Sequence, residues 1–373
     1  MHPVRHLRLL ALAPLAALSS ASPGRVAAIG DMRVARASHT ATPLPDGRVL
    51  IAGGFAGSGG EAEPYASTEI YDPAAGAFTE GPTMHVCRSG HTATVLRDGR
   101  VLLAGGWTGR YRASNTAEVY DARTGRLTPT GPLAAMRADQ TATLLADGRV
   151  LLAGGFDPDM RPLATAEIYD PATNRFTPTG SLTYPRGAHT ATLLADGRVL
   201  VVGGGGEGRY PNRAMQGEAE LYDPARGTFV SAGRMLVPRH KHAAVRLTDG
   251  SVLVVGGSDG SDWRGQMASA ERWIPATGRF VAAGRMVLAR FKLPGAVVAL
   301  RDGRVVVAGG GDRAEVYYPA DDQFALTDGS LGAARFYAAA APLRDGAVLV
   351  TGGYAESHGE LPATKRAFVF LPR

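Results

Sequence analysis

The feature that most constrains this chain is a phrase of about eighteen residues that occurs seven times. Each copy contains two apolar runs joined by Asp-Gly, a pair that favours a two-residue β-turn because glycine tolerates a positive φ. Each copy ends in Gly-Gly, which marks places where neighbouring backbones approach closely. The phrase therefore predicts seven β-hairpins, at 37–54, 89–106, 138–155, 187–204, 240–257, 293–310 and 336–353.

A second phrase follows the first six hairpins. It reads Glu-x-Tyr-Asp in the first four, as in "TEIYDP" at 68–73, and is "AERWIP" at 270–275 and "AEVYYP" at 314–319 in the other two. Seven residues after its aromatic residue comes another apolar residue. The pairs are Tyr71/Phe78, Tyr120/Leu127, Tyr169/Phe176, Tyr222/Phe229, Trp273/Phe280 and Tyr317/Phe324. The constant spacing predicts a third and a fourth strand, so each unit of about fifty residues is a four-stranded antiparallel sheet. Such a sheet buries both faces only when it is placed between two copies of itself, as in a circle of blades.

Composition agrees with an all-β fold. The chain has 373 residues with 49 glycines and 24 prolines, which favours turns over long helices. Cys87 is the only cysteine, so a disulfide within the chain is excluded. The net charge is +6 without the basic runs typical of nucleic-acid binding, so we expect no nucleic-acid partner.

The N-terminus has the pattern of a secretory signal. Arg5 and Arg8 precede a short apolar run, and small residues follow up to Ala21. We therefore expect cleavage near Ala21 and a secreted or periplasmic mature protein of residues 22–373. No later segment is apolar enough to predict a membrane span. We expect this mature chain to be a monomer with a single domain.

The repeated double glycine, the Glu-x-Tyr-Asp phrase and the downstream aromatic residue together resemble the kelch-repeat family, over about residues 25–373. The resemblance implies a seven-bladed β-propeller, similar to the propeller domain of galactose oxidase. One departure is that kelch repeats usually carry Trp where this chain has Phe or Leu.

The last unit lacks a fourth strand, because only Arg373 follows "KRAFVFLP" at 365–372. The segment "RVAAIGDM" at 25–32 is similar to "RFVAAGRM" at 279–286, the fourth strand of unit five. We therefore predict that Arg25 to Asp31 complete the final blade and close the ring, which leaves no unpaired edge there.

Repetition separates residues that build the blade from candidates for function. A histidine position recurs ten residues or so before the second strand, and holds His39, His91, Gln140, His189, His242, Gly295 and Ala338. Four histidines spread around a ring cannot meet at one metal or substrate. We interpret them as buried structural residues that bond to neighbouring backbone.

An arginine position lies three residues earlier and is open to two interpretations. It holds Arg36, Arg88, Arg137, Arg186, Arg239, Lys292 and Arg335. These cations either pair with the third-strand glutamates or form a basic funnel for anionic ligands. The glutamates are Glu69, Glu118, Glu167, Glu220, Glu271 and Glu315. Unit seven has Phe368 instead, which predicts that Arg335 is free. The kelch resemblance implies acidic-peptide binding, since ubiquitin-ligase adaptors of this family use arginines in matching positions.

Ligand binding is expected on the face that carries the variable loops, opposite the uniform Asp-Gly hairpins. Besides the six arginines, the aromatic candidates are Trp107, Tyr111, Tyr210, Trp263, Tyr337 and Tyr354. These residue types suit a carbohydrate or an acidic peptide.

We therefore expect an exported binding module with no cofactor and no metal. The alternative is a carbohydrate-active enzyme of kelch type: a sugar mutarotase, or with less support a galactose-oxidase-like oxidase. The resemblance to galactose oxidase implies that a copper site would need a Tyr-His pair, and no blade offers one, because Ala338 follows Tyr337.

Overall fold

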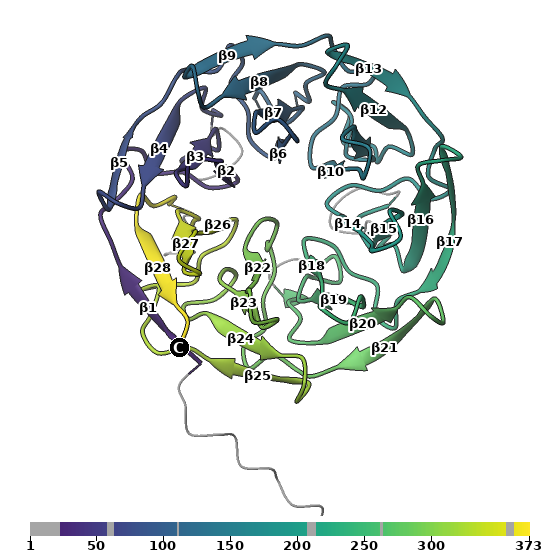
Figure 1. The fold of residues 1–373 in the computed structure, drawn as a ribbon. Helices are drawn as coiled ribbons and strands as arrows, with labels where there is room; N and C mark the ends of the chain where they lie inside the picture. The colour runs from purple at the N-terminus through teal and green to yellow at the C-terminus, as the bar shows by residue number, and fades with distance from the viewer. Residues whose placement is uncertain (1–22, 58–62, 110–111, 207–213, 262–263, 356–361) are drawn as a thin grey trace, which may run out of the picture.

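The computed structural model contains seven four-stranded antiparallel sheets arranged in a circle around one axis (Figure 1). It describes residues 23–57, 63–109, 112–206, 214–261, 264–355 and 362–373. This arrangement confirms the predicted all-β, seven-bladed propeller.

Each blade has the same strand order from the axis outwards. The innermost strands are β2 (Thr40–Pro43), β6 (Thr92–Val95), β10 (Thr141–Leu144), β14 (Thr190–Leu193), β18 (Ala243–Arg246), β22 (Val297–Ala299) and β26 (Ala339–Pro342). The second strands are β3 (Val49–Ala52), β7 (Val101–Ala104), β11 (Val150–Ala153), β15 (Val199–Val202), β19 (Val252–Val255), β23 (Val305–Val307) and β27 (Val348–Thr351).

The outer half of each blade comes from the second sequence phrase. The third strands are β4 (Thr68–Asp72), β8 (Ala117–Asp121), β12 (Ala166–Asp170), β16 (Glu218–Asp223), β20 (Ala270–Ile274), β24 (Glu315–Tyr318) and β28 (Ala367–Leu371). The outermost strands are β5 (Ala77–Glu80), β9 (Arg126–Pro129), β13 (Arg175–Pro178), β17 (Thr228–Arg234), β21 (Arg279–Ala283), β25 (Gln323–Leu326) and β1 (Arg25–Ala28).

The core lies between the blades, and the second strands supply its centre. Val49 and Ile51 on β3 pack toward the seventh blade, while Leu50 packs toward the second blade. All three side chains are completely buried, because both faces of the strand meet a neighbouring sheet. Full burial of such a side chain contributes about 1.5–3 kcal/mol, which explains why the second strands are apolar at every position except Thr351 of β27.

The aromatic spacing and the double glycine have the roles that the sequence predicts. Tyr71 pairs with Phe78 across β4 and β5, with ring centroids 4.8 Å apart. A Cβ atom on Gly53 would stand 2.3 Å from the carbonyl oxygen of Arg88 in the next blade, so no side chain fits there. The double glycines thus allow neighbouring blades to approach at the ends of their second strands.

The N-terminal strand closes the ring, as predicted. β1 pairs antiparallel with β28, with Val26 opposite Phe370 and Ala28 opposite Phe368, and the purple and yellow ends of the chain lie in one sheet (Figure 1). Regular pairing ends at Ala28 rather than at Asp31. The contact nevertheless continues, since the Met32 amide donates to the Lys365 carbonyl at 2.8 Å.

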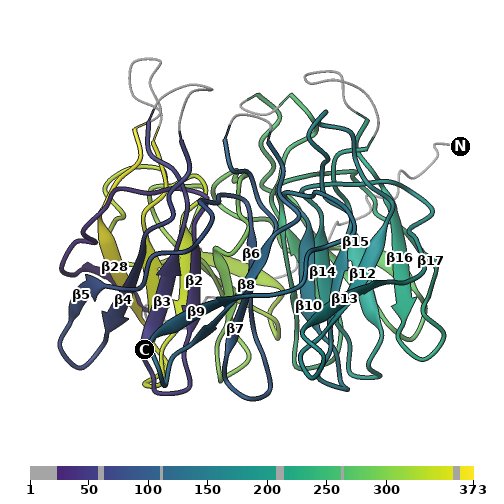
Figure 2. The same ribbon diagram turned by 90° about the horizontal axis from the view of Figure 1, so that it is seen from above.

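The two faces of the ring differ. The connections between second and third strands rise on one face, at the top of Figure 2, and the Asp-Gly turns lie on the other. We call the first the loop face and the second the hairpin face. None of the described residues forms a helical segment with the length and hydropathy that a transmembrane span requires.

Candidate functional site

Five of the candidate arginines lie inside the blades. Arg36, Arg88, Arg137, Arg186 and Arg239 have no exposed surface. In each case Nη2 bonds the glutamate of the same blade, as for Arg239 and Glu271 at 2.8 Å. The glutamate also accepts two backbone amides of the segment that enters the blade, those of Leu236 and Val237 for Glu271. This geometry is the structural pairing that the sequence analysis left open, and it places these guanidinium groups away from the surface.

In the sixth blade, the residues predicted for two repeated positions were wrong. Arg290, not Lys292, pairs with Glu315, at 2.9 Å. Leu293, not Gly295, takes the histidine position. In the fourth blade, a Cβ atom on Gly203 would meet His242 and the Arg239 carbonyl of the next blade. In the fifth blade, a Cβ atom on the equivalent Gly256 would meet Leu293 and the Arg290 carbonyl. The error arises because the sixth blade has two extra residues, Pro294 and Gly295, before its hairpin.

Arg335 of the seventh blade differs from the other arginines. Phe368 stands opposite Val350 in the register that glutamate has in the other blades. Among the described residues no carboxylate reaches Arg335, which instead donates from Nε and Nη2 to the Leu331 carbonyl. Burial lowers the pKa of Arg335, and the nearby charge of Arg366 lowers it further.

The repeated histidines join neighbouring blades. Nε2 of His189 bonds Oγ1 of Thr141 in the preceding blade at 3.1 Å, and His91 and His242 make the equivalent contacts with Thr40 and Thr190. His39 instead bonds Oγ1 of Thr351, on the second strand of the seventh blade, at 2.8 Å. The partner is thus a threonine hydroxyl rather than the predicted backbone group. Burial lowers the pKa of His91 and His189 to about 3, so these rings are neutral near pH 7. The expected structural role agrees with this geometry.

The residues before the histidine positions lie close to the axis, and all except that of the sixth blade line a pocket there. These residues are Ser38, Gly90, Asp139, Ala188, Lys241, Lys292 and Tyr337, and all have φ between 51° and 57°. Backbone hydrogen bonds link these residues in a circle, in which the Leu293 amide, rather than that of Lys292, donates to the Lys241 carbonyl at 3.1 Å. For example, the Asp139 amide donates to the Gly90 carbonyl at 2.9 Å, and the Ser38 amide donates to the Tyr337 carbonyl at 3.0 Å. We call this circle the axial ring.

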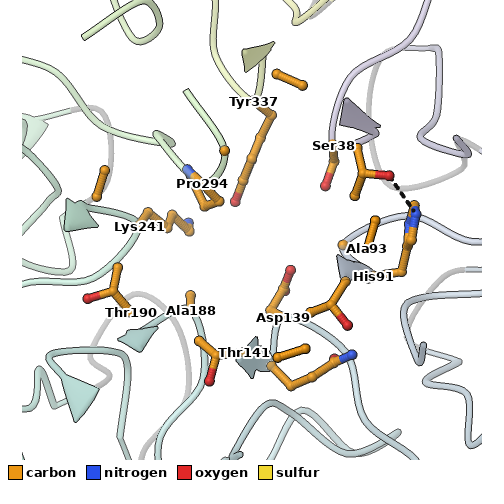
Figure 3. Close-up of a pocket in the computed structure, with 18 of the residues that line it drawn as sticks. Ser38, His91, Ala93, Asp139, Thr141, Ala188, Thr190, Lys241, Pro294 and Tyr337 are labelled. Atoms are coloured by element: carbon orange, nitrogen blue, oxygen red, sulfur yellow. Dashed lines mark hydrogen bonds between the residues drawn. The ribbon is translucent and has the colours of Figure 1, made fainter. Parts of the chain in front are cut away.

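The axial ring surrounds the mouth of a pocket of about 420 Å³ on the axis. Below the ring, the walls are the threonine and alanine side chains of the innermost strands. Asp139, Lys241, Ser38 and Tyr337 project toward the centre from different blades (Figure 3). The mouth therefore offers a carboxylate, an ammonium group, a hydroxyl group and a phenol.

Sequence reasoning included Tyr337 among the candidates and missed the other three. The available signal was variation within the repeat, since this position changes from blade to blade while the arginine before it recurs. Among the described residues no three His, Cys, Asp or Glu side chains gather as a metal site.

The remaining aromatic candidates lie around this mouth or outside the described residues. The indole nitrogen of Trp107 donates to Oδ2 of Asp139 at 3.1 Å, so Trp107 positions that carboxylate. Tyr354 is buried, and its hydroxyl accepts a hydrogen bond from Nζ of Lys292 at 2.6 Å. Tyr111, Tyr210 and Trp263 lie outside the described residues.

Comparisons with known proteins agree with this fold. The family described as "Kelch motif" matches residues 87–126 and 140–183, in the second and third blades. No curated protein sequence matches the chain. Among solved structures, a fungal alcohol oxidase of the AA5 family in complex with copper is similar, with a TM-score of 0.71 and 16% identity over 94% of this chain and 76% of that one. The second and third blades thus match the kelch motif, and the chain as a whole has a seven-bladed β-propeller fold similar to that of the AA5 alcohol oxidase.

Proposed function

We propose that the mature chain is an exported binding module that holds a carbohydrate in the axial pocket. One observation carries the proposal: the repeat position at the pocket mouth varies between blades, while the arginine and histidine positions beside it serve the scaffold. Variable polar and aromatic side chains on a rigid frame are typical of a binding site.

The chemistry of the mouth favours a sugar over an acidic peptide. Sugar hydroxyl groups both donate and accept hydrogen bonds, which matches Asp139, Lys241 and Ser38, while the ring of Tyr337 offers an apolar surface. An acidic peptide would need a cationic surface. Five of the six candidate arginines are occupied by buried glutamates, and Asp139 adds a negative charge to the mouth.

The proposed export rests on the sequence of residues 1–21. Cleavage near Ala21 is compatible with the fold, because the first strand of the ring begins at Arg25. The protein would then act in the periplasm or outside the cell.

The binding site can be tested with a glycan array, followed by titration calorimetry of the best ligand with residues 22–373. Tyr337→Ala, Asp139→Asn and Trp107→Ala should each weaken binding by about 1–3 kcal/mol. Arg48→Ala on the hairpin face is the control, because the Arg48 guanidinium bonds Asp46 within its own turn and does not line the pocket. Unchanged affinity in all three pocket variants would refute the axial site. If the protein instead binds an acidic peptide, and Arg335→Gln abolishes that binding, the ligand is an acidic peptide and not a sugar.

A sugar mutarotase is the second candidate, and the placement of Asp139 and Tyr337 at one mouth favours it. Mutarotation needs a group that removes the anomeric hydroxyl proton and a group that protonates the ring oxygen. A carboxylate and a phenol can fill these roles. Polarimetry of freshly dissolved α-glucose or α-galactose measures the activity. If the wild type does not accelerate the approach to equilibrium, or Asp139→Asn is as fast as wild type, the candidate fails.

The described residues do not fit a copper centre like that of the similar alcohol oxidase. The four recurring histidines are buried and bond threonines between blades, and Ala338 follows Tyr337. No step through copper is derived for this chain.

A further inference from the structure

The sixth blade breaks the sevenfold repeat at one point beside the axial pocket. In blade five the hairpin aspartate, Asp249, comes seven positions after the residue in the histidine position, His242. In blade six Asp302 comes nine positions after Leu293. The two additional residues are Pro294 and Gly295, and the hairpin resumes its usual course at Ala296, whose carbonyl accepts from Ala308 at 2.8 Å.

The insertion is held against the next blade and faces the pocket. The Gly295 carbonyl accepts a hydrogen bond from the Ala340 amide on β26 at 2.7 Å. Pro294 and Gly295 both line the pocket, and Pro294 lies near Tyr337 in Figure 3. A Cβ atom on Gly295 would meet no atom within 4 Å, so that direction opens into free space. The insertion is thus an ordered part of the pocket wall.

The charged group of blade six, the ammonium group of Lys292, also points away from the pocket mouth. Lys292 has the same axial-ring position as Lys241, but its Nζ donates to the Tyr354 hydroxyl and lies 4.7 Å from the ring centroid of Phe291. Lys292 is only 6% exposed. The sixth and seventh blades therefore present Pro294 and the ring of Tyr337 to the pocket, while Asp139 and Lys241 stand on other blades.

We infer that the Pro294–Gly295 insertion is the specificity element of the axial site. Together with Tyr337 it forms an apolar wall that receives the C–H face of one pyranose ring, while Asp139, Lys241 and Ser38 bind the hydroxyl groups. The inference rests on the proposed carbohydrate binding and names its ligand class: a pyranose with one face free of axial hydroxyl groups. An open-chain polyol lacks such a face and is rejected.

Gly295→Ala tests the wall with a matched control. The new methyl group would project into the pocket, and the residue would adopt φ of +74°, which strains any side chain. Gly125→Ala has the same features elsewhere, with φ of +70° and no atom within 4 Å, in the β8–β9 turn on the hairpin face. The two variants should lose similar stability, and only Gly295→Ala should weaken pyranoside binding, by about tenfold or more.

Deletion of Pro294 and Gly295 tests the specificity. The probes are methyl glucoside, methyl galactoside, methyl mannoside and sorbitol, titrated against wild-type and variant proteins. We expect the wild type to bind the three pyranosides and to reject sorbitol, and the deletion to bring its affinities for the pyranosides to within a few-fold of its affinity for sorbitol. Circular dichroism shows whether the deletion variant folds. If the deletion variant does not fold, the Gly295→Ala variant is used to test the proposal instead.

The outcomes distinguish the two proposals. If the wild type binds no pyranoside, the proposed function fails and the inference falls with it. If the wild type binds and selects, but Gly295→Ala binds like Gly125→Ala or the deletion selects like the wild type, only the role of the insertion is refuted.

Discussion

Arg239 and Glu271 form an ion pair that water does not reach, because neither side chain is more than 2% exposed. Two further amides bind the same carboxylate. Such a pair adds little net stability over apolar residues of the same size, but removing one partner leaves the other charged and buried. The arrangement recurs in six blades and thereby connects the entry segment of each blade to its third strand.

Arg239→Met should therefore destabilise the fold by about 3–5 kcal/mol. Arg335→Met should cost less, because no described carboxylate loses a partner there and only two hydrogen bonds to Leu331 are removed, each worth about 1 kcal/mol. Urea unfolding followed by circular dichroism gives both values. Equal losses would show that the glutamate is not the source of the cost.

The buried histidines make stability depend on pH. The folded pKa of His189 is about 3, below the unfolded value of about 6.5, so the unfolded chain binds a proton in this range that the folded chain does not. Stability must then fall as the pH decreases from about 6.5 toward 3, by up to about 1.4 kcal/mol per pH unit for each such histidine.

His189→Gln should remove this contribution, since Gln140 already fills the equivalent position and donates to the Ala104 carbonyl. The measurement is the difference in unfolding free energy between variant and wild type at pH 7 and at pH 4.5. Because only the wild type loses the His189 contribution on acidification, the unfolding free energy of the variant relative to wild type should be higher at pH 4.5 than at pH 7. A constant difference would contradict the assigned pKa.

The sequence revealed which residues build the blades, because repetition marks them, but not which residues form the mouth. Asp139 and Lys241 occupy a position that varies between copies, and variation alone does not tell a pocket residue from a loop residue. Their role follows from a backbone φ near 50°, which turns each side chain toward the axis. Only the structure supplies that angle.

At the scale of elements, β1 is the strand on which the ring depends. It contributes Val26, which is 6% exposed, and pairs over four residues with β28. The elements also show where alignment of the repeats by position number succeeds and where it fails. The closure was predicted correctly because one strand was missing, whereas the sixth blade was misaligned because the count ran backwards from its hairpin across Pro294 and Gly295.

Deletion of residues 22–31 should destabilise the protein strongly and expose the edge of β28, which favours association between chains. Thermal unfolding and sedimentation of residues 22–373 and 32–373 measure both effects. If the shorter chain melts within a few degrees of the longer one and stays monomeric, β1 is not required for closure.

At the scale of the whole molecule, every blade is buried between two others, and the circle has no free end. An open array of repeats can unfold from its ends, because each terminal repeat has a single neighbour. A closed ring lacks such ends. The loss of any one blade removes an interface from both neighbours at once.

We therefore expect a single cooperative transition in urea. Trp107 in the second blade and Trp273 in the fifth report on separate parts of the ring. The Trp107→Phe variant keeps Trp273 and Trp263 as fluorophores, and the Trp273→Phe variant keeps Trp107 and Trp263. Each should show the same midpoint as circular dichroism of the same variant. Different midpoints within one variant would mean that the blades unfold separately.

The pairing of β1 with β28 also has a consequence in time. Among the described strands, a ribosome makes β1 first and β28 last, so β1 has no partner until all the other strands of the ring have been made. Pairing across such a sequence separation is slow to form. A chain cut short before Ala367 would lack β28 and would leave β1 unpaired as well. The β1–β28 pairing thus requires synthesis to have passed β28, and a chain that stops earlier carries an open edge that proteases can recognise.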